Sequence, residues 1–217
     1  MHTFQRMKTS STLRACLVVV VAWTVAGSGF AQTATPSSNV DPKRLVTAAR
    51  KQIGVTTGYD AEYRSLAYPG GDVPMSTGVC TDVVTRALRE QGIDLQQVVH
   101  DDMKRHFAAY PHQWGLAAPD PNIDHRRVPN LMTFFRRQGW ERPVTAQGSD
   151  YLPGDVVTWN LGGGTTHIGV VADMAGRAAP TVIHNIGRGT QEEDVLFAFK
   201  IIGHYRPGKA PAHADPR

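Results

Sequence analysis

The sequence predicts an α+β domain in which N-terminal helices pack on a C-terminal antiparallel sheet. In the first half, apolar residues recur at intervals of three and four, which is the spacing of one helix face. After Gly148 the chain changes to short segments rich in β-branched and aromatic residues. Because the helices come first and the strands follow, we expect an antiparallel sheet rather than alternating βαβ units.

Residues 1–31 are predicted to form a secretory signal peptide. They contain three basic residues and no acidic one, an apolar run from Ala15 to Ala26, and the ending Gly29-Phe30-Ala31. The apolar run is shorter than the about 20 residues that cross a bilayer as a helix. We therefore expect an exported protein, periplasmic or secreted, with no transmembrane segment after signal cleavage.

Signal cleavage changes the charge balance of the chain. The 217 residues include 23 basic and 19 acidic side chains; removing 31 residues, three of them basic, leaves 186 residues with 20 basic against 19 acidic side chains. A net charge of about +1 lacks the basic excess of a nucleic-acid-binding protein, so no nucleic-acid partner is expected. The remaining length fits one domain, predicted over 41–206, between a linker at 32–40 and a disordered tail at 207–217.

Capping residues and glycine stops delimit the predicted helices. Asp41 is suited to cap a helix that starts with Pro42, and Gly54 ends this helix. From Val55 to Gly78 the glycines and prolines predict a loop. Further helices are predicted from Cys80 to Gly92, from the cap Asp94 through Phe107, and over 128–138.

Strands are predicted in the part of the chain after Gly148. Runs of β-branched and aromatic residues are separated there by glycine and proline turns. The predicted strands cover 155–159, 167–171, 181–185 and 197–205.

Cys80 is the single thiol of the predicted mature chain, because the other cysteine, Cys16, lies in the signal peptide. Exported domains use cysteines in pairs, so a lone cysteine indicates an intermolecular disulfide or a reactive thiol. Cys80 also opens a predicted helix, whose positive end favours the thiolate that nucleophilic attack requires. The alternative is a buried cysteine that only packs.

Two histidines lie in predicted strands of the C-terminal half. His167 stands in THIGVV and His184 in VIHNIG, where apolar neighbours give a polar ring no evident packing role. A nucleophilic cysteine needs a base, and that base needs an orienting partner. Both histidines are candidates for these two roles, and the alternative is that they are hydrogen-bonded core residues.

Four features follow one another along the chain. They are a cysteine at a helix start, Pro153-Gly154-Asp155 leading into a strand, the segment HIGVV from His167 to Val171, and a further strand with His184. This order resembles the NlpC-type cell-wall peptidases, which are secreted bacterial cysteine hydrolases of the papain-like superfamily. The resemblance implies a papain-like fold, Cys80 as nucleophile, His167 as general base and His184 as the residue that orients it. It also implies peptidoglycan peptides as substrate, cleaved through an acyl-enzyme intermediate.

The chain differs from these peptidases around the nucleophile, where it has Val79-Cys80-Thr81-Asp82 instead of the usual Asp-Cys-Ser-Gly. Asn185 is the alternative orienting residue, as in the Cys-His-Asn arrangement of other papain-like enzymes. Strand alternation allows only one of His184 and Asn185 to face the site. The strings YPGGDVP, GVCTDVV, NIDHRRVPNL and HNIG also resemble an uncharacterised family of secreted bacterial proteins, described only as a domain of unknown function.

Three charged residues are candidates for substrate binding. Arg126 and Arg127 could receive the carboxylates of a stem peptide through paired hydrogen bonds, and the alternative is a solvated loop. Asp82 follows the predicted nucleophile by two residues. It either binds a substrate amine or favours the first turn of its helix.

Two other classes of function are weighed against the hydrolase. A zinc hydrolase would use ligands such as His100, Asp101 and His125, but the sequence has no H-E-x-x-H segment or close histidine pair. A non-catalytic module of the same fold would hold cell-wall peptides without cleaving them. The presence of cysteine and two histidines favours the hydrolase, for which neither metal nor cofactor is expected.

Overall fold

The computed structural model describes residues 1–2, 39–173, 178–209 and 211. The chain divides into two units, Met1–Thr35 and Pro36–Arg217, and every element named below belongs to the second unit. After its first two residues, the predicted signal peptide at 1–31 lies outside the described residues. The same holds for 32–38 of the predicted linker and for 212–217 of the predicted tail.

Two of the four α-helices begin directly after their predicted capping residues. Asp41 accepts hydrogen bonds from the backbone N–H groups of Lys43 and Arg44, and Asp94 accepts one from Gln96. In the described part of the chain, no helix combines the length and apolar character needed to cross a membrane. The α-helices are α1 (Pro42–Arg50), α2 (Cys80–Arg89), α3 (Leu95–His106) and α4 (Val128–Arg137), and the 3₁₀ helices are η1 (Phe107–Ala109), η2 (Asp124–Arg126) and η3 (Gly148–Asp150).

One antiparallel sheet has the strand order β1-β6-β2-β3-β4-β5. Its strands are β1 (Glu141–Arg142), β2 (Val156–Asn160), β3 (Thr166–Val171), β4 (Val182–Asn185), β5 (Thr190–Glu193) and β6 (Lys200–Tyr205). The four predicted strands correspond to β2, β3, β4 and β6. The sequence does not predict the two edge strands, because β1 has two residues and β5 is polar throughout.

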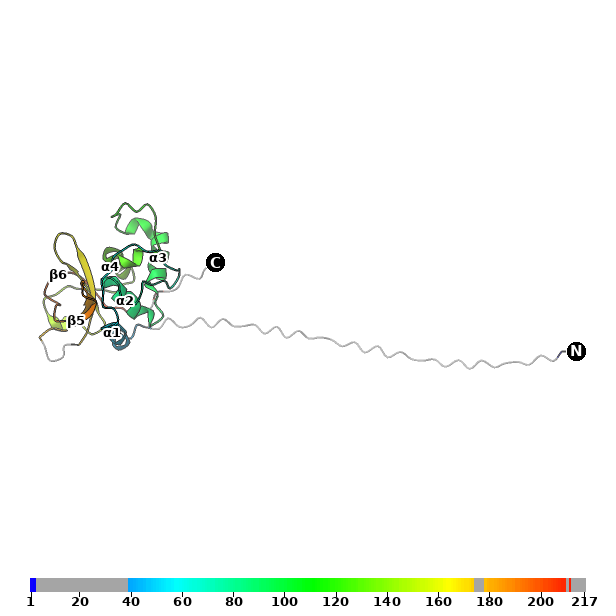
Figure 1. Ribbon diagram of the computed structural model, residues 1–217, viewed down its shortest axis with the longest axis horizontal. Helices are drawn as coiled ribbons and strands as arrows, with labels where there is room; N and C mark the ends of the chain where they lie inside the picture. Colours follow the sequence, from blue (N-terminus) through cyan, green and yellow to red (C-terminus); the bar gives the residue numbers. More distant parts are fainter. Residues whose placement is uncertain (3–38, 174–177, 210, 212–217) are drawn as a thin grey trace. The chain divides into compact units, whose positions relative to one another are not determined.

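The two faces of the sheet are buried by different partners. One face carries Ile168, Val170 and Ile183, which share a hydrophobic cluster with buried residues of all four α-helices; Figure 1 shows these helices beside the sheet. The opposite face carries Trp159 and Val171, which pack with residues of the connecting loops. Side-chain alternation along each strand produces this separation. The predicted α+β class, with N-terminal helices packed on a C-terminal antiparallel sheet, is confirmed.

The folded part extends beyond the predicted boundaries at residues 41 and 206. Asn39 forms an antiparallel bridge with Lys209, and the Val40 N–H donates to the Gly208 carbonyl at 2.8 Å. This pairing joins the end of the predicted linker to the start of the predicted tail. These two segments satisfy each other's backbone groups, a long-range pairing that their polar and proline-rich composition does not reveal.

A long loop between α1 and α2 leads into the helix that starts with Cys80. Residues 56–79 contain turns but neither helix nor strand, as predicted. Arg86 of α2 anchors this loop, because its guanidinium contacts the Asp72 carboxylate at 2.9 and 3.0 Å and donates to the carbonyls of Val73 and Thr77. The anchored loop fixes the path of the chain into Cys80.

Candidate active site

Cys80 is the first residue of α2 and lies against β3. Its side chain is buried, and the backbone N–H groups of Ile168, Thr81 and Cys80 itself favour its thiolate form. Ile168 directly follows His167 on β3. The fold therefore brings the thiol to the strand segment that carries the predicted base.

Burial governs the acidity of this thiol. Loss of solvation raises the pKa of Cys80 to about 12; the backbone N–H groups lower it, and the neighbouring Asp82 carboxylate raises it. The helix N-terminus was expected to favour the thiolate. Its roughly half a positive charge is outweighed by desolvation, so the sulfur is protonated at neutral pH and needs a proton acceptor before it can attack.

His167 and His184 are hydrogen bonded to each other. Nε2 of His167 lies 2.9 Å from Nδ1 of His184, and the two rings meet edge to face. Trp159 of β2 stacks on His167 with ring centroids 5.5 Å apart and lies tilted against His184. Three neighbouring strands thus place two imidazoles and an indole on one face of the sheet. The indole shields the imidazole pair from solvent and strengthens its hydrogen bond.

Asn185, the alternative orienting residue, has a different set of contacts. Its side-chain amide donates to the carbonyls of Gly58 and Gly78, each at 3.1 Å. Adjacent residues of a strand face opposite sides of a sheet, so the contact of His184 with His167 directs Asn185 away from it. Asn185 instead ties together two loop segments, one of which ends two residues before Cys80.

Both histidines have lowered pKa values. Burial, with a smaller contribution from His184, lowers the pKa of His167 to about 3. Burial also lowers the pKa of His184, against the opposite effect of Glu193. The two rings are therefore uncharged at neutral pH, and burial makes His167 a weaker base than a histidine in water.

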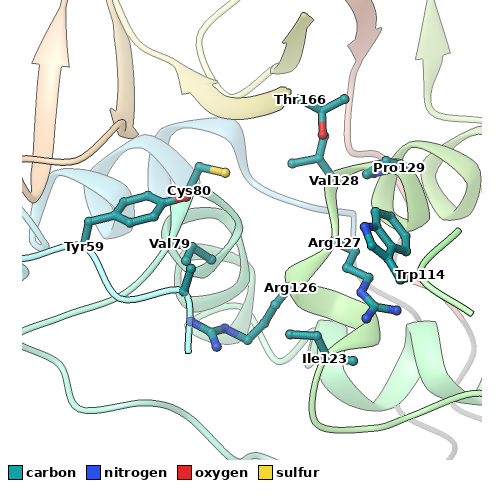
Figure 2. A pocket seen from close by; sticks show the side chains of 11 residues that line it. Tyr59, Val79, Cys80, Trp114, Ile123, Arg126, Arg127, Val128, Pro129 and Thr166 are labelled. Atoms are coloured by element: carbon teal, nitrogen blue, oxygen red, sulfur yellow. The ribbon is translucent and has the colours of Figure 1, made fainter. Parts of the chain in front are cut away.

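An open cleft of about 210 Å³ adjoins Cys80. Figure 2 shows Tyr59 beside Cys80, with Trp114, Pro129 and Thr166 across the cleft. Burial, followed by the nearby charge of Cys80, raises the pKa of Tyr59 to about 12. The Tyr59 hydroxyl therefore keeps its proton and is available as a hydrogen-bond donor next to the sulfur.

Asp82 and Arg126, two of the predicted substrate-binding residues, are bonded to each other. The Arg126 guanidinium donates to both carboxylate oxygens of Asp82 at 3.2 and 3.1 Å, and both side chains are buried. Asp82 also accepts from the Val79 N–H at 2.7 Å, which caps the start of α2. Arg126 further donates to the carbonyls of Glu62 and Asp60. Their hydrogen bonds are thus used within the fold, where they position the helix start that carries Cys80.

Arg127, the third predicted binding residue, also lines the Cys80 cleft, but it is not paired with Asp82 as Arg126 is. Its guanidinium lies over the Trp114 ring, 4.4 Å from the centroid. Burial lowers the pKa of Arg127, while Asp124 and Asp120 raise it. Its Nη1 atom is buried and has no hydrogen-bond partner among the described residues. A guanidinium that lines the cleft is a group that can bind a carboxylate.

Comparison with protein families places this arrangement in a known family. A family model described as "Domain of unknown function (DUF1287)" matches residues 46–207, a range that contains Cys80, His167 and His184. The chain belongs to the DUF1287 family. Over 163 residues, the chain is also 57% identical to an Escherichia coli (strain K12) protein named "Uncharacterized protein YijF". This match covers 75% of the present chain and 80% of that protein.

Three residues of this DUF1287 site were not predicted from the sequence. Tyr59 and Trp114 lie in loops, with 44% and 53% of their surface exposed. In the sequence, the available signal for both was an aromatic residue outside any periodic apolar pattern. Glu193 places its Oε2 atom 3.2 Å from Nε2 of His184. Its strand β5 was not predicted, so nothing in the sequence brought it to the site.

The three residues weighed as zinc ligands do not form a cluster. His100 lies 3.7 Å from Asp124, and Asp101 accepts a hydrogen bond from Tyr68. His125 is buried, and burial lowers its pKa to about 4. Across the part of the chain that the structure describes, no three histidine, cysteine, aspartate or glutamate side chains converge as a metal site.

Proposed function

We propose that this DUF1287 protein is an exported cysteine hydrolase of papain-like architecture that cleaves amide bonds in peptidoglycan peptides. One observation carries the proposal. The Cys80 sulfur accepts a hydrogen bond from the N–H of Ile168, the residue after His167, while His167 is held through Nε2 by His184. The thiol thus lies at the backbone of the residue next to a neutral, oriented imidazole, which supports a cysteine–histidine mechanism.

The proposed reaction starts from two neutral groups. His167 uses Nε2 for its bond to His184, so Nδ1 is the ring nitrogen that takes the proton in the proposed reaction. As the sulfur attacks the substrate carbonyl carbon, its proton moves to Nδ1 and a C–S bond forms. The imidazolium then gives this proton to the leaving amine as the C–N bond breaks. Water, activated by His167, hydrolyses the thioester and regenerates the thiol.

The tetrahedral intermediate carries a negative oxygen that needs hydrogen-bond donors. Backbone N–H groups at the start of α2 are oriented toward the sulfur, and the Tyr59 hydroxyl lies beside Cys80 with its pKa raised to about 12. These donors are in place before the reaction, which is the arrangement that stabilises an oxyanion most effectively.

Arg127 supports a substrate with a free carboxylate. Stem peptides of peptidoglycan carry such groups, and Arg127 lines the Cys80 cleft with its guanidinium stacked on Trp114. Arg126 has no comparable role in this proposal, because Asp82 and two carbonyls take up its donors. Export through the predicted signal peptide would deliver the enzyme to this substrate.

Digestion of purified peptidoglycan tests the proposal. We expect the protein to release soluble peptides, detected by mass spectrometry, and expect Cys80→Ala and His167→Gln to release none while remaining folded by circular dichroism. His106→Gln, which replaces an exposed histidine on α3, is the matched control and should keep full activity. Full activity of Cys80→Ala would exclude the thiol mechanism.

A second candidate function is a binding module without catalysis. The specific observation in its favour is the buried thiol, whose pKa of about 12 is that of an inert cysteine. A binding module would retain peptidoglycan fragments on a column without cleaving them, and Cys80→Ala would bind as well as the unmodified protein. Release of peptides that depends on Cys80 would exclude this candidate.

A further inference from the structure

We infer that Glu193 is a positioning residue that sets the ring tautomers of His184 and His167. The expected effect on catalysis rests on the proposed function, whereas the contact between Glu193 and His184 belongs to the fold itself. Oε2 of Glu193 lies 3.2 Å from Nε2 of His184. This nitrogen is buried and has no well-aligned hydrogen bond among the described residues, so attraction to the carboxylate defines its environment.

The strand register puts Glu193 on the correct face of the sheet. Glu193 of β5 pairs with Val182 of β4, and His184 lies two residues further along the same face. Trp159 of β2 pairs with His167 of β3 and stacks on its ring. Four consecutive strands therefore contribute one side chain each to a continuous row that ends at the carboxylate.

The row of contacts determines which nitrogen carries each proton. The Glu193 carboxylate can only accept, so it favours the His184 tautomer with the proton on Nε2. Nδ1 of this neutral ring then accepts a hydrogen bond, and the donor is the Nε2–H of His167. A neutral His167 with its proton on Nε2 has an unprotonated Nδ1. That is the atom that the proposed reaction uses as the base.

Gly169 and Arg188 surround the contact between Glu193 and His184. Gly169 of β3 gives His184 room, because a Cβ at this position would lie 3.1 Å from the His184 Cβ and 2.7 Å from Val182 Cγ1. Arg188 lies 3.2 Å from the other carboxylate oxygen of Glu193, with 76% of its side chain exposed. The carboxylate is thus held between a surface arginine and a buried imidazole.

Glu193→Ala, Glu193→Gln and a control variant test the inference by two independent measurements. The control is Glu141→Gln, which makes the same chemical change on the exposed strand at the opposite edge of the sheet. The first measurement is the ¹⁵N NMR spectrum of the histidine rings, which distinguishes the two tautomers. We expect one tautomer for His184 and His167 in the unmodified protein and in Glu141→Gln, and tautomer mixtures in Glu193→Ala. Glu193→Gln, whose amide oxygen accepts the same proton, should restore most of the original pattern.

The second measurement is the kinetics of peptide release. We expect kcat to fall about 10- to 100-fold in Glu193→Ala with little change in KM, as for other groups that orient a reactive histidine. An unchanged NMR pattern in Glu193→Ala would overturn the inference, and so would a shifted pattern with unchanged kcat. If the unmodified protein cleaves no peptide, the proposed function fails, whereas a tautomer change in Glu193→Ala would still support the structural role of Glu193.

Discussion

Acidification from pH 7 to pH 5 should destabilise this protein through its buried histidines. His125 and His167 are almost fully buried, and burial lowers their pKa values to about 4 and about 3. Both rings are neutral in the folded protein at pH 5, whereas in the unfolded chain, with a pKa near 6.5, they are charged. A group with a lowered folded pKa of this kind contributes stability above pH 6.5 and loses it as the pH falls.

The magnitude follows from the pKa values. At pH 5, a histidine that titrates near 6.5 when unfolded and near 3 or 4 when folded costs about 2 kcal/mol relative to neutral pH. Two such rings give about 4 kcal/mol, and His184 acts in the same direction. Asp124 acts in the opposite direction, because burial raises its pKa to about 6 and protonation returns about 1 kcal/mol at pH 5. The expected net loss is about 3 kcal/mol.

Urea unfolding at pH 7 and pH 5 measures this difference. We expect the free energy of unfolding to fall by about 3 kcal/mol, and expect His125→Gln to remove about 2 kcal/mol of that dependence. Equal stability at the two pH values, or greater stability at pH 5, would refute the conclusion that these rings are buried and neutral.

Two further predictions separate the roles of the neighbouring arginines. Arg126→Met should lower the free energy of unfolding by about 3 to 5 kcal/mol in urea titrations, because it leaves the Asp82 carboxylate buried with a single N–H partner; a loss below 1 kcal/mol would contradict the structural role. Arg127→Gln should raise KM for carboxylate-bearing peptides more than it lowers kcat, because a binding interaction is lost in both the ground and the transition state. Arg136→Gln on α4 is the matched control, and an unchanged KM in Arg127→Gln would remove the proposed carboxylate anchor.

Local patterns in the sequence were sufficient to place the helix that carries Cys80. Asp41 and Asp94 cap their helices, and Cys80 begins α2 where the apolar periodicity begins. Strand alternation also predicted that one of His184 and Asn185 would face His167, but not which of them. Periodicity reports which residues share a face, and it does not reveal on which side of a sheet that face lies.

Contacts between distant segments could not be predicted. Asp82 and Arg126 are 44 residues apart in the sequence. Their ion pair gives these two predicted substrate-binding residues a structural role. Glu193 lies on a polar edge strand that has no apolar alternation, so its approach to His184 was not visible either. The acidity of Cys80 depends on burial, which outweighs the local effect of the helix terminus.

Hydroxylamine trapping shows whether Cys80 forms an acyl-enzyme during turnover. A thioester on Cys80 partitions between water and hydroxylamine, so turnover of peptidoglycan peptides with added hydroxylamine should yield peptide hydroxamates beside free carboxylates. Mass spectrometry distinguishes these products. We expect hydroxamates with the unmodified protein and none with Cys80→Ala. Cleavage that yields carboxylates alone in hydroxylamine, or hydroxamates from Cys80→Ala, would contradict a thiol nucleophile at this position.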